Sequence, residues 1–320
     1  MKWCFFPTPY HRLDLGLAEL RSLWIKRDDL NGLAGGGNKT RKLKHYLQHI
    51  QSNGYTAIVT EGAPQSNHCR QTAAMAAANA LPVTLILGGT GPTEMVGNLL
   101  IDQIVGARIV HTEPDGREDA ALEAMKLLRE QGQRPLRIPV GGSAPIGVEA
   151  YAEGICEWFE EQKTLDWTPD VIVHASSSGG TQAGLALGLA RLGLSTRVLG
   201  ISVDHSEAEL RGIVESLIDQ TEADLAIAER AKALACYCAD YLGLGYARPS
   251  QFEAEAIQRV ARSTGILLDP VYSGRAMAGF LDLVRQGKFN QQHVIFWHTG
   301  GLPSIHAFGA PESWPVLKGF

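Results

Sequence analysis

Short apolar, β-branched segments alternate with segments of helical character along this chain, and this alternation restricts the fold more than any other feature. The apolar segments end in glycine or small polar residues, as in "TAIVTEG", "PVTLILGG", "DVIVHASSSGG" and "HVIFWHTGG". Between most of them lie stretches such as "HCRQTAAMAAANA" and "TQAGLALGLARLG". Alternating strands and helices predict an α/β fold with largely parallel sheets. Ligands of such sheets bind beyond the carboxyl ends of the strands, where the glycine-rich segments of this chain fall.

Chain length and composition narrow the possibilities further. The 320 residues are long for a single core, which favours two domains. We place the divisions near residues 43 and 150, so that 1–42 and 151–320 form a large discontinuous domain and 43–150 a small one. The 45% of apolar and 20% of charged residues are typical of a globular protein. A formal net charge of -5 gives no general attraction for nucleic acids or anionic membranes, so small soluble ligands are the expected partners.

Cysteine usage and the apolar segments predict a cytoplasmic protein. The 5 cysteines are odd in number and scattered, which favours free thiols in a reducing compartment. Pro7 and Pro9 interrupt the apolar start, and no later run approaches the length of a transmembrane helix. The cysteines of "CYC" at 236–238 lack metal-ligand spacing, and we expect no metal site.

The stretch "GGGNKTRKLKHYL" at 35–47 puts Lys39 directly behind a glycine run and before a predicted helix. It is close to the phosphate loop G-x-x-x-x-G-K-[ST], but Asn38 intervenes before the lysine and the spacing fails by one residue. From this stretch alone, two interpretations stay open. Either Lys39 is a functional amine, or it joins Arg41, Lys42 and Lys44 in a solvated charge run on a surface helix.

Four polar loops follow predicted strands and could meet in one site. In "EGAPQSNHCRQTAA" a polar run opens an alanine-rich helix, whose free N–H groups can seat a carboxylate. In "HASSSGGTQAG" serines and glycines converge on another helix start, which suits a single phosphate monoester. "LLDPVYSGRAMAG" presents Tyr272 and Ser273 from a loop, and "VIFWHTGGLPS" delivers His298 and Thr299 to a glycine turn. A lysine, a phosphate seat and a carboxylate seat, without a metal-ligand cluster, are the requirements of pyridoxal phosphate catalysis.

The same motifs also resemble a known family. "GGGNKTRKL", "QSNHCRQTAA", "SSSGGTQAG", "GLGYARP", "LDPVYSGRAM" and "HTGGLPS" resemble, in order and over nearly the whole chain, the D-cysteine desulfhydrase and 1-aminocyclopropane-1-carboxylate deaminase family. Its members are tryptophan synthase β-like, fold-type II pyridoxal phosphate enzymes. The resemblance implies two open, twisted, mostly parallel sheets flanked by helices, an active site in the cleft between two domains, and a homodimer.

Residue roles are implied by this resemblance. Lys39 would bond to the cofactor aldehyde, and Asn67 would hydrogen-bond the ring hydroxyl. Lys39, Ser66 and Tyr272 are the predicted catalytic residues. The predicted phosphate ligands are Ser178, Gly179, Gly180 and Thr181. The predicted substrate-binding residues are Gln65, Ser66, Asn67 and His68 for the carboxylate, with Tyr246 and Tyr272 flanking the substrate.

Two positions bear on the substrate. The ring-opening deaminases resemble one another in having glutamate after the tyrosine of "VYSG" and leucine before the glycines of "HTGG", where this chain has Ser273 and Thr299. A glutamate at the pyridine nitrogen would keep it protonated for carbon–carbon cleavage, whereas a neutral hydroxyl suffices when sulfide leaves. The pattern favours D-cysteine desulfhydrase, with Thr299 as first choice and Ser273 as second for the ring nitrogen. Alternatives are elimination from another substrate such as L-cysteate, the ring-opening deaminase, and a regulatory protein that binds the cofactor or phosphate without turnover.

Overall fold

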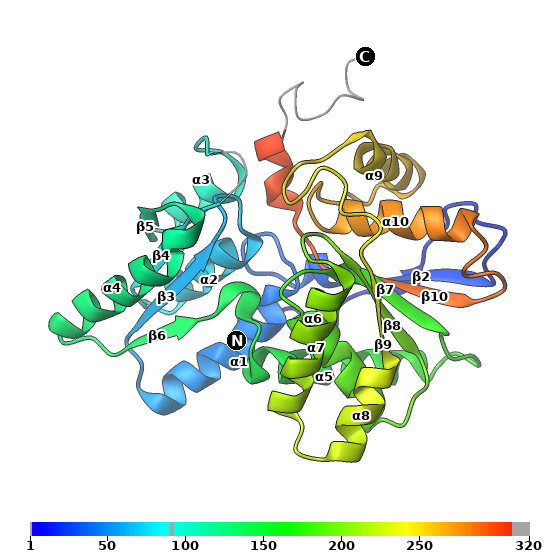
Figure 1. The fold of residues 1–320 in the computed structure, drawn as a ribbon, viewed down its shortest axis with the longest axis horizontal. Coiled ribbons are helices and arrows are strands. Elements are labelled where there is room, and N and C mark those ends of the chain that lie inside the picture. The colour runs from blue at the N-terminus through cyan, green and yellow to red at the C-terminus, as the bar shows by residue number, and fades with distance from the viewer. Residues whose placement is uncertain (1, 90–92, 309–320) are drawn as a thin grey trace.

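Two separate β-sheets form the frame of the protein in the computed structural model, which describes residues 2–89 and 93–308. The six-stranded sheet has the order β1-β2-β10-β7-β8-β9, and every neighbouring pair is parallel except β1 and β2. The four-stranded sheet has the order β5-β4-β3-β6 and is parallel throughout. The expectation of two mostly parallel sheets flanked by helices is therefore confirmed, and Figure 1 shows them side by side, the smaller on the left.

The strands of the six-stranded sheet are β1 (Tyr10–Arg12), β2 (Ser22–Arg27), β7 (Val171–Ser176), β8 (Arg197–Ser202), β9 (Ala235–Cys238) and β10 (His293–His298). Those of the four-stranded sheet are β3 (Ala57–Gly62), β4 (Val83–Leu87), β5 (Arg108–His111) and β6 (Pro135–Ile138). The central strands β3, β4 and β7 are buried at every residue, because helices cover both faces of each sheet. This explains why their sequences are continuous apolar runs instead of alternating ones.

The helices are α1 (Lys39–Asn53), α2 (Asn67–Ala78), α3 (Gly97–Ile104), α4 (Arg117–Glu130), α5 (Pro145–Gln162), α6 (Gly180–Arg191), α7 (Glu207–Thr221), α8 (Leu225–Leu234), α9 (Gln251–Thr264) and α10 (Ser273–Arg285). Short 3-10 turns are η1 (Asp28–Leu30), η2 (Pro114–Gly116), η3 (Val140–Gly142) and η4 (Leu302–Phe308). Capping boxes at Ser206 and Ser250 start α7 and α9 by satisfying free N–H groups, and left-handed glycines end α1 and α9. Among the described residues, no helix is long and apolar enough to cross a membrane.

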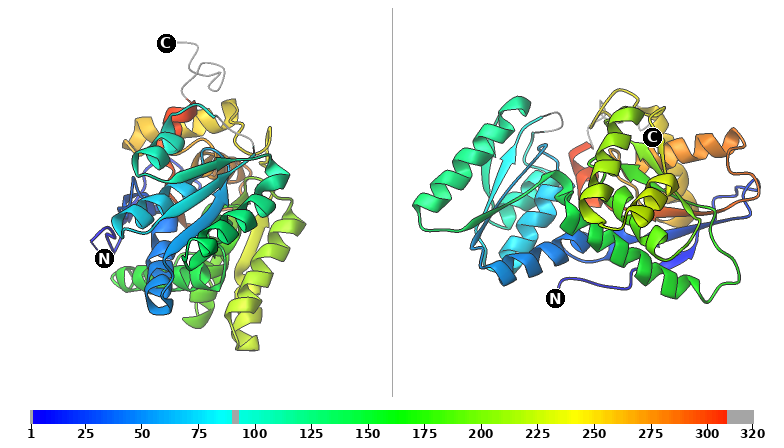
Figure 2. Two further views of the ribbon diagram at one scale, coloured as in Figure 1. Left: turned by 90° about the vertical axis from the view of Figure 1, so that its left-hand side faces the viewer. Right: turned by 60° about the horizontal axis from the view of Figure 1, so that its bottom comes forward.

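Apolar clusters fill both faces of each sheet. One cluster lies between the six-stranded sheet and α9 and α10, and a second lies between its other face and α5 to α8. In the smaller half, α1, α2 and α3 cover one face of the four-stranded sheet and α4 covers the other, as the two views of Figure 2 show. The four-stranded sheet falls within residues 57–138. The predicted divisions near residues 43 and 150 lie inside α1 and α5, and this division of the chain stays a prediction.

Candidate active site

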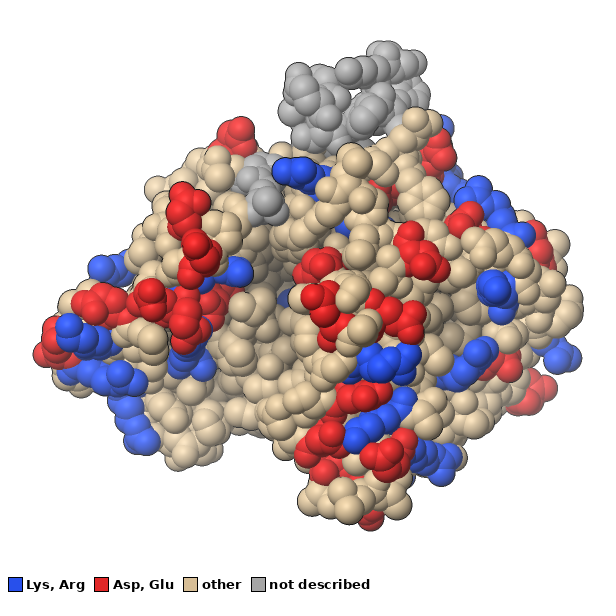
Figure 3. Space-filling model, in the orientation of Figure 1, with Lys and Arg blue, Asp and Glu red and all other residues tan. Residues whose placement is uncertain are grey.

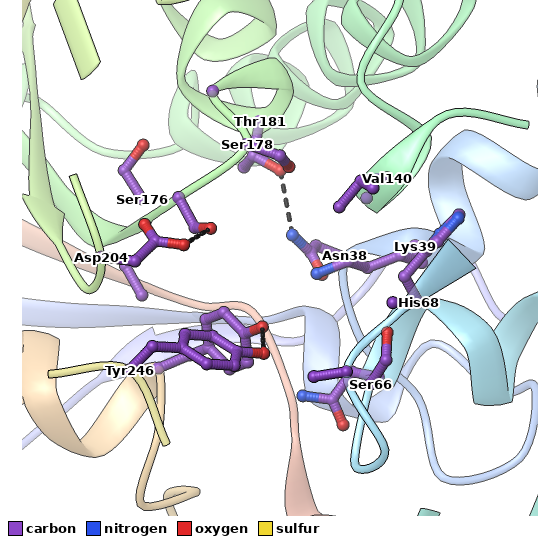
Figure 4. Close-up of a pocket in the computed structure, with 18 of the residues that line it drawn as sticks. Asn38, Lys39, Ser66, His68, Val140, Ser176, Ser178, Thr181, Asp204 and Tyr246 are labelled. Carbon is purple, nitrogen blue, oxygen red and sulfur yellow. Dashed lines mark hydrogen bonds between the residues drawn. The ribbon is translucent and has the colours of Figure 1, made fainter. Parts of the chain in front are cut away.

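A cavity of about 500 Å³ opens between the two sheets, where the surface in Figure 3 is hollowed. Its walls are the loops that follow β3, β4 and β6 on one side and β7, β8 and β10 on the other. The carboxyl ends of both sheets therefore point at the same space, as expected for α/β folds. Figure 4 shows the residues of the smaller half, Ser66 and His68, facing Asp204 and Tyr246 of the larger one.

Lys39 is the first residue of α1 and reaches the cavity through the glycine loop before it. Gly36 and Gly37 have φ angles of +69° and +130°, and a Cβ atom on Gly36 would lie 1.9 Å from the carbonyl oxygen of Asp29. Only glycine fits so tight a turn. The lysine side chain is partly open to the cavity, and the surrounding protein lowers its pKa to about 8, chiefly by desolvation and then by the positive charge of Arg70.

The start of α2 forms the second wall. Ser66 caps the helix by accepting a hydrogen bond from the Cys69 amide at 3.2 Å, and Ser66, Asn67 and His68 line the cavity. Gln65 does not line it, because its amide bonds to α3, accepting from the Asn98 amide at 2.9 Å. Ser66 already accepts from the Cys69 amide, so the N–H groups of this helix start that can bind a carboxylate are those of Asn67 and His68.

His68 is held as a neutral imidazole of defined tautomer. The Thr60 hydroxyl donates to the Ile138 carbonyl at 2.7 Å, so its contact of 2.7 Å with His68 Nε2 requires the histidine to be the donor. Burial lowers the pKa of His68 well below its usual value, and the charges of Lys39 and Lys42 add to this shift. The imidazole is therefore uncharged, and His68 offers a bound carboxylate no positive charge.

The loop between β7 and α6 has the features of a phosphate seat. Ser178, Gly179 and Thr181 line the cavity at the N-terminus of α6, and Asn38 Nδ2 donates to Thr181 Oγ1 at 3.0 Å, as drawn in Figure 4. Gly180 lies behind this rim. A Cβ atom there would come within 2.6 Å of Ser143 Oγ and 2.9 Å of Lys42 Nζ, so glycine permits the close packing of this seat.

The basic residues after Lys39 are not a solvated charge run, and that interpretation is wrong for two of them. Arg41 is 4% exposed and bonds Asp28 and Glu157, while Lys42 is 1% exposed. Lys42 donates to the Gly141 carbonyl at 2.9 Å and to Ser143 Oγ at 3.2 Å, and Ser143 Oγ lies 2.8 Å from Ser178 Oγ. The buried amine of Lys42, whose pKa burial lowers well below its usual value, thus lies directly behind the phosphate seat. Its three-residue spacing from Lys39 on one helix was the available sequence signal.

Two tyrosines and a threonine complete the wall formed by the larger half. Tyr246 and Tyr272 line the cavity with their hydroxyl oxygens 2.6 Å apart, and Lys39 Nζ lies 5.4 Å from the ring centroid of Tyr272. Thr299 lines the cavity as well. The Ser273 hydroxyl is buried at the start of α10, where it donates to Asp269 Oδ1 at 2.6 Å, and it does not line the cavity.

Several lining residues were not predicted from the sequence, and two of them are charged. Asp204 follows β8 and accepts a hydrogen bond from Ser177 Oγ at 2.6 Å, and burial raises the pKa of its carboxyl group. Arg117, at the start of α4, lines the cavity from the smaller half. The position of Asp204 directly after a parallel strand was the signal that could have found it. Within residues 2–89 and 93–308, no group of three or more His, Cys, Asp or Glu side chains could hold a metal ion.

Comparison with known proteins identifies the family. Residues 4–300 match the family model described as pyridoxal-phosphate dependent enzyme. The chain belongs to this family. It is 37% identical over 295 residues to a D-cysteine desulfhydrase of Salmonella typhi, an alignment that covers 90% of this chain and 89% of that one. It is also 37% identical over 290 residues to a Pyrococcus abyssi protein provisionally named 1-aminocyclopropane-1-carboxylate deaminase, covering 90% of this chain and 86% of that one.

The structural comparison agrees with the sequence relatives. A crystal structure described as an ACC deaminase homologue superposes with a TM-score of 0.83 and 32% identity, covering 96% of this chain and 93% of the other. The protein is thus a pyridoxal-phosphate dependent enzyme with the fold of that group. The residues present fit its cofactor, because the amine of Lys39 and the hydroxyl-rich start of α6 line one cavity and the buried amine of Lys42 lies directly behind that helix start.

Proposed function

We propose that this pyridoxal-phosphate dependent enzyme catalyses β-elimination on a small amino acid, with D-cysteine as substrate and pyruvate, sulfide and ammonia as products. The observation that carries the choice is the pair of neutral hydroxyl residues, Thr299 in the cavity wall and Ser273 beside it, where the ring-opening deaminases resemble one another in having leucine and glutamate. The 37% identity to a D-cysteine desulfhydrase supports the same substrate.

The residues of this chain supply the base, the binding sites for the substrate carboxylate and the cofactor phosphate, and the contacts that orient the cofactor ring. Pyridoxal phosphate, when bound, withdraws electrons from the α-carbon of an attached amino acid. Lys39 Nζ accepts the α-proton, and its pKa of about 8 lets a sizeable fraction be neutral near physiological pH. The N-terminus of α2, from Ser66 to His68, holds the substrate carboxylate. Ser178, Gly179, Gly180, Thr181 and Lys42 hold the phosphate, and Asn67 and Thr299 contact the ring.

The balance of the reaction is simple. The bond from the β-carbon to sulfur breaks, and its electron pair leaves with sulfur as sulfide. The α-proton has gone to Lys39, and a water molecule then converts the three-carbon product into pyruvate and ammonia. Tyr272 either gives the departing sulfur a proton or orients the substrate, since its hydroxyl faces the cavity beside that of Tyr246.

A substrate panel tests this proposal. The purified protein should be yellow and should bleach with borohydride, and Lys39→Ala protein should show neither covalent cofactor nor sulfide release. D-cysteine, L-cysteine, β-chloro-D-alanine, L-cysteate and 1-aminocyclopropane-1-carboxylate are then assayed for pyruvate, 2-oxobutyrate, sulfide and sulfite. We expect sulfide and pyruvate from D-cysteine at the highest kcat/KM. Sulfite from L-cysteate, or 2-oxobutyrate from the cyclopropane amino acid, as the main product would replace D-cysteine by that substrate.

We also propose that the enzyme is a cytoplasmic homodimer. Its five free cysteines and modest charge suit a reducing compartment, and relatives in this family are dimers by the resemblance described above. Sedimentation equilibrium should give twice the chain mass of 34.6 kDa, and cell fractionation should recover the activity with the cytosol.

A further inference from the structure

Arg70 is a buried cation that bonds only to neutral oxygens near the cofactor site. It lies one turn after Asn67 on α2 and is 0% exposed. Its Nη1 donates to Asn67 Oδ1 and to Asn98 Oδ1, both at 2.8 Å, and its Nη2 donates to the Gly36 carbonyl at 2.9 Å. Among the described residues it forms no hydrogen-bonded ion pair. An unpaired buried charge is costly, so a simple structural role would be better served by an apolar side chain.

These bonds determine which way the Asn67 amide faces. A guanidinium can only donate, so the amide atom that meets Arg70 Nη1 must be the oxygen. Asn98 Nδ2 donates to the same oxygen at 2.9 Å, and its own orientation is fixed because it also donates to the Gln65 carbonyl at 2.7 Å. With two donors on Oδ1, the other end of the Asn67 amide is Nδ2. Asn67 lines the cavity, so a hydrogen-bond donor is left there for a ligand.

Arg70 also connects this amide to the loop that carries Lys39. Its bond to the Gly36 carbonyl ties α2 to the glycine turn three residues before the lysine. The titratable groups around Lys39 are Arg70, which lowers the pKa of the amine, and Asp269, which raises it, with Lys42 and the neutral His68 also close enough to interact. Asp102 and Asp269 are the carboxylates that act on Arg70 itself. One guanidinium thus bonds both the Asn67 amide and the glycine turn that precedes Lys39.

We propose that Arg70 is a positioning residue that fixes the Asn67 amide with Nδ2 toward the cofactor, so that it donates to the oxygen substituent of the pyridine ring. The inference rests on the cofactor role of Asn67 within the proposed function. Without Arg70, only the Asn98 amide would hold Oδ1, so the opposite orientation, in which the oxygen faces the ring oxygen acceptor to acceptor, would become more populated. The guanidinium therefore favours the one orientation of the Asn67 amide in which Nδ2 donates to the cofactor.

Cofactor binding by a matched pair of ligands tests this role without any substrate. The dissociation constants of pyridoxal phosphate and of its 3-deoxy analogue, which lacks the ring hydroxyl, are measured by absorbance titration of cofactor-free protein. Wild-type protein should prefer pyridoxal phosphate by roughly tenfold, the scale of one hydrogen bond. Asn67→Ala should abolish that preference and Arg70→Met should reduce it, and the double variant should be no worse than Asn67→Ala, because Arg70 acts through Asn67.

Two further variants separate positioning from folding. Gln71→Met changes a neighbouring side chain of α2 that donates to Thr40 Oγ1 at 2.8 Å and, among the described residues, makes no side-chain hydrogen bond to Asn67, so it should keep the preference for the ring hydroxyl. Asn98→Ala removes the second donor to Asn67 Oδ1 and should reduce the preference even if Arg70→Met protein does not fold. Equal weakening of both ligands by Arg70→Met or Asn98→Ala, or additive effects with Asn67→Ala, would overturn the proposal. Failure to turn over D-cysteine would sink the substrate assignment and leave these binding results intact.

Discussion

The hydroxyl oxygens of Tyr246 and Tyr272 lie 2.6 Å apart at the edge of the cofactor cavity, in hydrogen-bond contact with each other. Only one of the two protons can lie between them, so the other hydroxyl proton is directed elsewhere. Burial raises the pKa of Tyr246 to about 12 and that of Tyr272 well above its usual value. Both groups therefore stay protonated through the physiological range, as a proton donor to a leaving group must be.

This contact predicts a leaving-group dependence. If Tyr272 protonates the departing sulfur, Tyr272→Phe should lower kcat/KM for D-cysteine by about a hundredfold or more, the usual scale of general acid catalysis. Chloride needs no proton to leave, so β-chloro-D-alanine should lose much less. Pyruvate formation from both substrates is the measurement, with Tyr246→Phe as the matched control. An equal loss for both substrates would mean that Tyr272 only orients the substrate.

Lys42 predicts a difference between two forms of the cofactor. Burial lowers the pKa of Lys42 well below its ordinary value, and a phosphate dianion at the start of α6 would favour its charged form again. Lys42→Met should weaken binding of pyridoxal phosphate roughly 10- to 100-fold, because it removes a positive charge directly behind the phosphate seat and the bond of that amine to Ser143. Binding of pyridoxal, which has no phosphate, should change little.

Lys44→Met is the matched control for Lys42→Met. Lys44 lies on the same helix but bonds Glu153 at 2.6 Å near the surface, away from the cavity. It should bind both cofactor forms like the wild type. A comparable loss of pyridoxal and pyridoxal phosphate in Lys42→Met protein would contradict a phosphate role.

The lowered pKa of Lys39 predicts a pH-dependent stability of the cofactor-free protein. The pKa is about 8 in the folded chain against an ordinary lysine value of 10.5, so between these pH values the unfolded chain binds more protons. The free energy of unfolding is therefore highest, as far as Lys39 is concerned, above pH 10.5, where the amine is neutral in both states. It decreases as the pH falls from 10.5 to about 8, because the unfolded chain takes up the proton first. Urea unfolding of wild-type and Lys39→Met protein, measured from pH 7 to 10, should diverge toward low pH.

In that comparison the Lys39→Met protein should be the more stable one at pH 7, by on the order of 2 kcal/mol after allowance for cavity water. Heat-induced unfolding provides an independent measurement. Parallel pH profiles for the two proteins would show that the amine is not perturbed in the absence of cofactor. Reaction with borohydride and pyridoxal at several pH values reports the same amine directly.

Thr299 and Ser273 should respond differently to loss of their hydroxyl groups. Thr299→Val removes a hydroxyl from the cavity wall and should shift the absorption of the bound cofactor and lower turnover without changing stability much. Ser273→Ala removes a buried bond to Asp269, whose carboxylate also accepts from the Tyr272 amide at 2.9 Å, so stability should fall by about 1 kcal/mol or more. A cofactor spectrum altered by Ser273→Ala alone would make Ser273 the partner of the ring nitrogen.

The alternation of strands and helices determined the fold class, because parallel strands buried on both faces must be continuous apolar runs. Seven strands of the two sheets coincide with apolar runs in the sequence, whereas β1, β2 and β9 do not stand out. β1 has only three residues, and β2 carries the buried Lys26, which bonds the Thr8 carbonyl at 2.7 Å. A charged residue breaks the apolar pattern, and only its tertiary partners make its burial possible.

The candidate site divides in the same way. The sequence alone marked Lys39, the polar start of α2 and the serine- and glycine-rich start of α6, because helix starts after strands carry free N–H groups wherever they occur. Whether Lys42 faces solvent or the phosphate seat depends on the packing of α1 against η3 and α5, which local sequence does not contain. The same holds for Arg70, whose role arises from oxygens contributed by three separate segments of the chain. The sequence alone determines which chemical groups are present and where helices start. The partners that determine the charge and the orientation of a buried side chain are brought together only by the tertiary fold.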